Sequence, residues 1–172
     1  MGKVVLYLAL TLDGYIADLN EGYAFLEPYG DPDVYDFDKF MARIGGIIMG
    51  RVSYQQIMSQ TDVWPYKDYI TYVYTRNKTL NDPNVTFTQE DPRLVIQEIK
   101  AKTNKDIWLF GGGEVIDQFI KLNLVDEYIL NYVPEVLSEG IPLFRREILK
   151  KLEIVSHKTY GQILEVILKP KK

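Results

Sequence analysis

Nearly continuous runs of apolar residues mark strands in the first two thirds of the chain. They occupy residues 4–12, 45–50 and 107–110. Such a run is typical of a strand that is buried on both faces of a sheet. Residues 69–75 and the short segment 85–89 add two strands that are rich in β-branched and aromatic residues.

Between these strands, apolar residues recur at helical spacing. Residues 32–44 carry an apolar stripe, which consists of Val34, Phe37, Phe40, Met41 and Ile44. Shorter helices are predicted over residues 52–59 and 113–122. A further helix begins at Asp91-Pro92 and runs to residue 102, because an aspartate cap followed by proline is a strong start signal.

The last third of the chain is rich in strands. Residues 127–137 predict a sixth strand, and residues 152–160 and 163–169 flank Gly161 as a hairpin. Alternating strands and helices predict a single domain over residues 1–172. Its expected fold is three-layer α/β, with a mixed, mostly parallel central sheet, flanking helices and a C-terminal antiparallel hairpin.

The amino-acid composition argues against several classes of functional site and ligand. The chain has no cysteine, so disulfides, thiolate metal sites and cysteine nucleophiles are excluded, which agrees with a cytoplasmic protein. His157 is the single histidine, and no metal site is predicted. A net charge of -4 argues against binding to nucleic acid. No apolar run approaches the ~20 residues of a membrane span, and the apolar amino terminus is interpreted as a buried strand instead of a signal peptide.

Three consecutive glycines, Gly111, Gly112 and Gly113, join the strand 107–110 to the next helix. The Rossmann pattern needs glycine where Ile116 stands, and the P-loop pattern needs a Gly-Lys-Ser/Thr sequence that is absent. Two explanations stay open at this point. The glycines either let a phosphate approach the free N–H groups of the helix start, or they form a tight turn that needs positive φ angles.

Two further strand ends carry groups that suit a phosphate. Gly50 ends one strand, and Arg51 and Ser53 follow in the first turn of the next helix. Thr75 ends the strand 69–75 and Arg76 follows it, at the edge where open α/β sheets bind ligands. Each arginine alone is equally compatible with a solvated surface side chain, but three such junctions together favour a nucleotide site.

The chain resembles the dihydrofolate reductase-like superfamily, and within it the reductase domain of riboflavin biosynthesis, the RibD C-terminal type. The motifs "LTLDGYIAD", "MGRVSY", "VYTRN", "LFGGGEVIDQFI" and "VPEVLSEGIPLF" carry the resemblance. They occur in the family's order and extend over residues 4–144. The Pro-Trp segment of true dihydrofolate reductases is absent, and "EPYGDPDVYDF" stands in its place. A zinc deaminase domain, which often accompanies the riboflavin reductase, is also absent.

The resemblance implies that NADPH binds across the strand ends. The implied cofactor contacts are Ala9, Ile16, Gly50, Arg51, Ser53, Thr75, Arg76, Gly111, Gly112, Gly113, Glu114 and Val115. In this family a cis peptide bond would join Gly111 to Gly112, and Ala9 and Ile16 would hold the nicotinamide carboxamide. Glu114 would point to solvent or act as a helix-start charge near the phosphates.

Reduction of a C=N or C=O bond needs a proton in addition to the hydride that the nicotinamide supplies. The resemblance implies an acid on the helix after the first strand, four residues before an aromatic ring. This spacing favours Asp36 as the acid, with Phe40 at the substrate, while Asp38 and Asp33 remain competitors. Asp13 is interpreted as a turn residue beside the nicotinamide with a possible substrate role.

The resulting hypothesis is an NADPH-dependent reductase of a small pterin-, pyrimidine- or sugar-linked substrate. The alternative hypothesis is a nucleotide-binding protein of the same fold without significant catalysis. Residues 132–144 and the tyrosine-rich strands hold more apolar side chains than a monomer needs to expose. A homodimer is therefore expected.

Overall fold

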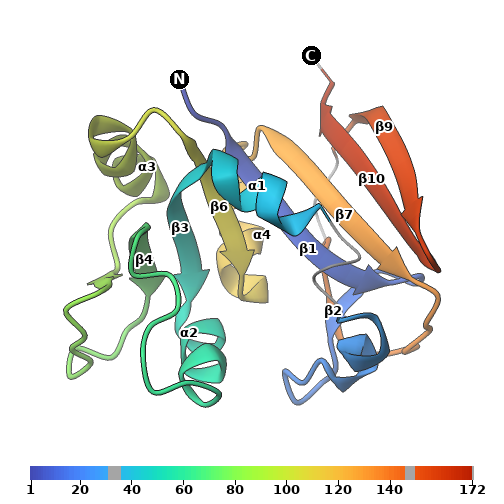
Figure 1. The fold of residues 1–172 in the computed structure, drawn as a ribbon, viewed down its shortest axis with the longest axis horizontal. Helices are drawn as coiled ribbons and strands as arrows, with labels where there is room; N and C mark the ends of the chain where they lie inside the picture. Colours follow the sequence, from blue (N-terminus) through green and yellow to red (C-terminus); the bar gives the residue numbers. More distant parts are fainter. Residues whose placement is uncertain (31–35, 146–149, 172) are drawn as a thin grey trace.

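The computed structural model describes residues 1–30, 36–145 and 150–171, and its centre is one eight-stranded sheet (Figure 1). The strands lie in this order across the sheet: β5 (Thr86–Thr88), β4 (Ile70–Tyr74), β3 (Ile44–Gly50), β6 (Asp106–Gly111), β1 (Val4–Thr11), β7 (Glu127–Val133), β10 (Ile163–Pro170) and β9 (Leu152–Tyr160). Neighbours from β5 to β7 are parallel. The hairpin of β9 and β10 is antiparallel.

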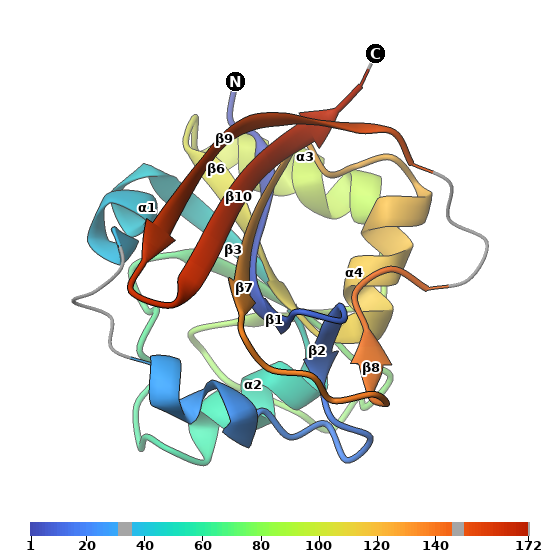
Figure 2. The ribbon, with the colours of Figure 1, turned by 90° about the vertical axis from the view of Figure 1, so that its right-hand side faces the viewer.

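In the described part of the chain, four α-helices cover the sheet, two on each face (Figure 2). Helices α1 (Phe37–Arg43) and α2 (Arg51–Met58) lie on one face, and Phe40 and Tyr54 join the core there. Helices α3 (Pro92–Lys102) and α4 (Gly113–Lys121) lie on the other face. The three-layer fold with a mostly parallel sheet and a C-terminal hairpin is therefore confirmed.

Three short elements lie near the carboxyl ends of the parallel strands, in the lower half of Figure 2. They are a 3-10 helix η1 (Ala24–Tyr29) and the strands β2 (Tyr15–Ala17) and β8 (Ile141–Pro142), which pair with each other. None of the three was predicted from the sequence, because elements of a few residues carry no periodic pattern. They border the edge of the sheet where the predicted site lies.

Several predicted boundaries differ from the structure, most of them by one residue. Two of the differences have a clear physical reason. Ile44 belongs to β3 and not to the preceding helix, since α1 ends at Arg43 and the chain passes directly into extended backbone. Strand β7 stops at Val133 instead of continuing to residue 137. Pro134 follows it, and proline has no N–H to donate to a ladder. The residues 32–35 of the predicted first helix lie outside the described residues.

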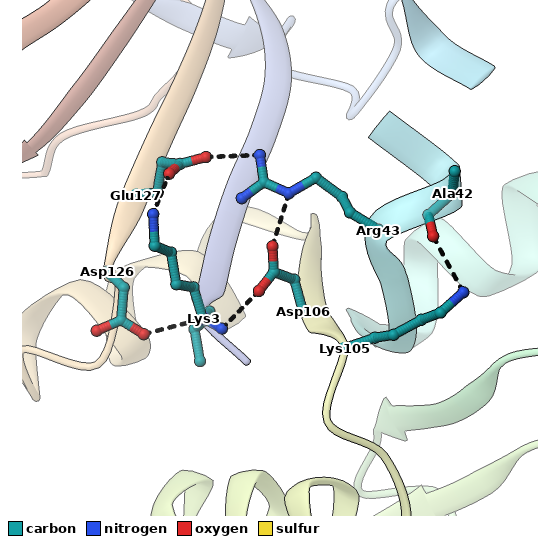
Figure 3. Close-up of polar contacts among 8 residues, drawn as sticks. Lys3, Ala42, Arg43, Lys105, Asp106, Asp126 and Glu127 are labelled. Atoms are coloured by element: carbon teal, nitrogen blue, oxygen red, sulfur yellow. Dashed lines mark hydrogen bonds and ion pairs between the residues drawn. The ribbon is translucent and has the colours of Figure 1, made fainter. Parts of the chain in front are cut away.

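A network of ion pairs lies at the opposite edge of the sheet, where the parallel strands begin (Figure 3). Arg43 Nε donates to Asp106 Oδ2 at 2.6 Å, and its Nη1 lies 2.9 Å from Glu127 Oε1. Lys3 Nζ reaches the other Glu127 oxygen at 2.8 Å. Burial alone would raise the pKa of Glu127, but hydrogen bonds from Lys3 and Arg43 lower it below its ordinary value. The network ties α1, β6 and β7 to the first residues of the chain.

No helix within the described ranges is long and apolar enough to cross a membrane.

Candidate active site

The carboxyl ends of β3 and β4 open into a cavity of about 630 Å³, which we call the basic cavity. Its lining consists of Glu21, Gly50, Arg51, Val52, Tyr74, Thr75, Arg76, Asn77, Thr88, Gln89, Gly112, Gly113, Glu114, Val115 and Gln118. Two arginines and the starts of α2 and α4 meet there. Guanidinium groups and helix N-termini both favour an anionic ligand.

Local hydrogen bonds hold the polar groups of the basic cavity. Gly50 pairs with Tyr74 in the ladder of β3 and β4, so Arg51 and Thr75 follow neighbouring strand ends. The Arg51 Nη1 donates to Gln55 Oε1 at 2.6 Å along α2. The Asn77 amide donates to Thr75 Oγ1 at 3.0 Å. The turn after β4 is thereby held in a defined conformation beside Arg76.

A second cavity of about 420 Å³, the apolar cleft, continues from the first. Its lining consists of Tyr7, Leu8, Ala9, Ile16, Ala17, Glu21, Tyr23, Leu26, Val52, Ser53, Gln56, Ile57, Gln60, Trp108, Phe110, Gly111, Gly112, Gly113, Ile116 and Ile141. Glu21, Val52, Gly112 and Gly113 line both cavities. The two cavities therefore form one groove, with the glycine turn at its middle.

Gly112 needs its glycine for two reasons. Its φ is 89° and its ψ is 111°, a conformation that residues with a side chain rarely adopt. A Cβ atom at this position would also lie 3.3 Å from the Gly50 Cα. The two glycine junctions are therefore packed against each other in the middle of the groove. No cis peptide bond occurs among the described residues, so the cis bond expected between Gly111 and Gly112 was wrong; positive φ at Gly112 makes the turn instead.

A third cavity of about 260 Å³, the aromatic pocket, adjoins the apolar cleft. Its lining consists of Tyr7, Ala9, Leu26, Tyr29, Gly30, Phe37, Asn131 and Val133. Tyr7, Ala9 and Leu26 line both the cleft and this pocket. The three cavities thus run in series along the carboxyl edge of the sheet.

The structure brings together all twelve predicted cofactor residues. Ala9, Ile16, Ser53 and Gly111 line the apolar cleft, and Gly112 and Gly113 line both cavities. The basic cavity holds the other six, which are Gly50, Arg51, Thr75, Arg76, Glu114 and Val115. Residues from four separate junctions of the sequence therefore converge on one groove.

The predicted acid lies outside these cavities. The Asp36 Oδ1 accepts from Lys39 Nζ at 2.9 Å, and its Oδ2 accepts from Lys158 Nζ at 3.0 Å. These hydrogen bonds lower the pKa of Asp36 to about 2, and the bond from Lys39 has the largest effect. A carboxylate that stays ionised above this pKa is a poor proton donor. The structure therefore argues against Asp36 as the acid.

The other predicted substrate residues also fall outside the three linings. Phe40 is 5% exposed and stacks behind Tyr7, with ring centroids 4.3 Å apart, so it supports the pocket wall without lining it. Asp13 accepts from the Thr11 hydroxyl at 2.6 Å and from the Ser138 amide at 2.8 Å. The hydrogen bond from Thr11 lowers the pKa of Asp13, as do the backbone amides of Ser138 and Leu137, although desolvation alone would raise it. These bonds fit a turn residue. Asp38 is exposed on α1, and Asp33 lies outside the described residues.

Sequence reasoning missed several residues of the site. Tyr29 lines the aromatic pocket and donates to Glu135 Oε1 at 2.8 Å, a bond that raises the pKa of Tyr29. Arg145 reaches the glycine turn, because its Nη2 lies 2.9 Å from where a Cβ of Gly113 would be. Asn131 is a polar residue that interrupts the apolar run after Glu127 in β7, and that interruption could have marked it. No signal in the sequence brings Tyr29 or Arg145 to the site, since Tyr29 ends a short 3-10 helix and Arg145 lies outside the helices and strands.

No group of three or more histidine, aspartate or glutamate side chains that could hold a metal occurs in the described part of the chain.

Comparison with known proteins assigns a family to this arrangement. The model of the RibD C-terminal domain matches residues 2–166. The chain is 32% identical to the uncharacterized protein YwjB of Bacillus subtilis over 166 residues, which is 95% of each protein.

Three solved structures share the fold. A Shewanella sp. PV-4 protein assigned to riboflavin biosynthesis is 25% identical, with a TM-score of 0.84 and 99% of each chain covered. A deaminase/5-amino-6-(5-phosphoribosylamino)uracil reductase from Thermotoga maritima is 16% identical, with a TM-score of 0.73 over 99% of this chain and 57% of that chain. Dihydrofolate reductase from Enterococcus faecalis, complexed with NADP(H), is 14% identical, with a TM-score of 0.72 over 99% and 98% of the two chains.

Proposed function

The chain belongs to the RibD C-terminal domain family, and from this membership we propose that it is an NADPH-dependent reductase of a small heterocyclic substrate. The substrate would carry a C=N or C=O bond that accepts a hydride. Because the chain has no cysteine, we propose the cytoplasm as its location.

One observation carries the proposal: the basic cavity and the apolar cleft form a single groove that shares the glycine turn. A phosphorylated dinucleotide has the same division, with charged phosphates in one half and a flat nicotinamide ring in the other. Arg51 and Arg76 would meet the phosphates in the basic half, and Arg145 would reach them beside Gly113. Ala9 and Ile16 would contact the nicotinamide in the apolar half.

The aromatic pocket would hold the substrate, since it shares Tyr7 and Ala9 with the apolar cleft. Bound NADPH would supply the hydride. The Tyr7 and Phe37 rings would orient a flat substrate and exclude water from it. A proton would come from Tyr29, or from a water held by Tyr29 and Glu135, because Asp36 is paired elsewhere.

The position of Asp36 also favours a second candidate, a nucleotide-binding protein without significant turnover. Such a protein would keep the groove and lack an acid at the substrate. The two candidates differ in one measurement, the oxidation of NADPH. We propose to follow absorbance loss with a panel of pterins, pyrimidines and ketones. Turnover of any of them supports the reductase, whereas tight NADPH binding without turnover supports the binding protein.

Cofactor choice tests the role of the arginines. We expect NADPH to bind at least roughly tenfold more tightly than NADH, because a charged hydrogen bond to the extra phosphate contributes about 1.5–3 kcal/mol. Calorimetric titration measures both dissociation constants. Arg76→Ala should remove most of the preference, while Arg93→Ala, on the exposed first turn of α3, should keep it. Equal affinity of the wild-type protein for the two cofactors would contradict the proposal.

Exposed apolar side chains support assembly into a homodimer. Val136 is 62% exposed and Phe144 is 40% exposed within residues 132–144, and Ile154 and Val155 are exposed on the edge strand β9. An edge strand also presents unpaired backbone groups. We expect light scattering at micromolar concentration to give about twice the 20.0 kDa of one chain. A mass of one chain at every concentration would refute the dimer.

A further inference from the structure

The aromatic pocket contains one buried amide, that of Asn131, in an otherwise apolar and aromatic lining. Asn131 is 2% exposed. It lies on β7 between Ala9 of β1 and Glu165 of β10, its partners across the two ladders. The sheet therefore fixes the amide at the floor of the pocket, and it has little freedom to turn toward solvent.

The hydrogen bonding of this amide is incomplete. The Asn131 Nδ2 donates to the Leu8 carbonyl over a long distance of 3.4 Å. The Asn131 Oδ1 is buried and has no hydrogen-bond partner among the described residues. A buried acceptor without a donor is unfavourable, and most buried polar groups in folded proteins are paired. A ligand in the pocket that presents an N–H would complete the bonding.

The charges around the pocket oppose an anionic ligand. The described lining contains no lysine or arginine. Lys158, on β9, is held by Asp36 at 3.0 Å, and Glu135 stands behind Tyr29. A phosphate would therefore find no cation in the described lining of this pocket, in contrast to the basic cavity.

From these observations we propose that Asn131 determines substrate specificity: its Oδ1 accepts a hydrogen bond from a ring N–H of an uncharged, unphosphorylated planar heterocycle. The inference rests on the proposed function, because it assigns the aromatic pocket to the substrate. The Tyr7, Tyr29 and Phe37 rings supply flat walls, and Asn131 supplies the buried amide that distinguishes one edge of the ring from another.

The test compares rings with and without the donor. The probes are uracil, pyridone and quinazolinone, each with its N-methylated counterpart, titrated into the protein with and without NADPH. For at least one pair we expect the N–H form to bind roughly tenfold to hundredfold more tightly, which is the effect of leaving one buried partner unpaired. Asn131→Leu removes the acceptor at similar volume and should abolish the preference while leaving the NADPH dissociation constant unchanged.

Each outcome decides the proposal. Equal binding of every pair, or no binding of any N–H form, would overturn it, and this comparison needs only the wild-type protein. Tighter binding of uridine monophosphate than of uridine would overturn the unphosphorylated substrate class. A preference that persists in folded Asn131→Leu would assign the recognition to another group. NADPH binding and NADPH oxidation are measured separately and report on the proposed reductase, so its failure is distinguished from failure of the Asn131 assignment.

Discussion

Gly112→Ala is expected to bind NADPH roughly tenfold to hundredfold more weakly than the wild-type protein. Alanine is strained at a φ of 89°, and its Cβ would press on Gly50, 3.3 Å from its Cα. Either response, a changed turn or a displaced Gly50, alters both walls of the groove at its middle. Calorimetric titration with NADPH measures the loss after circular dichroism has verified the fold.

Gly161→Ala is the matched control. Gly161 also has a positive φ, of 56°, but lies in the hairpin of β9 and β10 with open space around the position of a Cβ. This variant should lose some stability and keep its affinity for NADPH. If a folded Gly112→Ala protein binds NADPH as well as Gly161→Ala does, the glycines are only a tight turn and the proposed phosphate cradle is incorrect.

Arg43→Met is expected to lower the free energy of unfolding by about 1–3 kcal/mol near pH 7. Breaking a fully buried pair typically costs about 3–5 kcal/mol, and the effect here is smaller because the Arg43 side chain is 37% exposed. The substitution leaves Glu127 paired with the Lys3 ammonium, and leaves Asp106 with a hydrogen bond from the uncharged backbone N–H of Lys3. Both carboxylates are largely buried. Urea unfolding at several pH values measures the difference between the variant and the wild-type protein.

The difference should shrink in acid. Because the folded-state pKa of Glu127 lies below its ordinary value of 4.5, the stabilisation is complete above that value and is lost as the pH falls through the lower, folded-state pKa. Arg93→Met, which removes the exposed pair with Asp91, should change stability by less than about 1 kcal/mol at any pH. An Arg43→Met effect no larger than that of Arg93→Met would show that the network contributes nothing measurable.

Much of the fold could be predicted from the sequence, because its long elements carry strong local patterns. The buried stripe of α4, formed by Val115, Ile116, Phe119 and Ile120, followed directly from spacing. Asp91 caps α3 through the Arg93 amide, as the start signal indicated. In contrast, the pairing of β2 with β8 joins two very short segments more than a hundred residues apart, and such pairing depends on tertiary packing alone.

The cofactor groove was more predictable than the substrate pocket for a physical reason. Parallel strands bring their carboxyl ends to one edge of the sheet. Residues that follow Gly50 and Tyr74 therefore lie close together, whatever the conformation of the loops. The orientation of the Asp36 side chain is not determined by the order of the strands. It depends on Lys158 and Tyr160, which a distant hairpin brings to the start of α1. No local pattern around Asp36 contains that information.

The central position of β1 has a consequence for how the chain folds during synthesis. Val4 pairs with Ile107, so the first strand made must wait for about 100 further residues before either of its neighbours exists. At ~5–20 residues per second, that wait lasts ~5–20 s on a translating ribosome. Once the segment has left the ribosome, its apolar side chains have no neighbouring strand to cover them. Binding of this segment by a chaperone in the interval would protect the chain from aggregation without any change to the finished sheet.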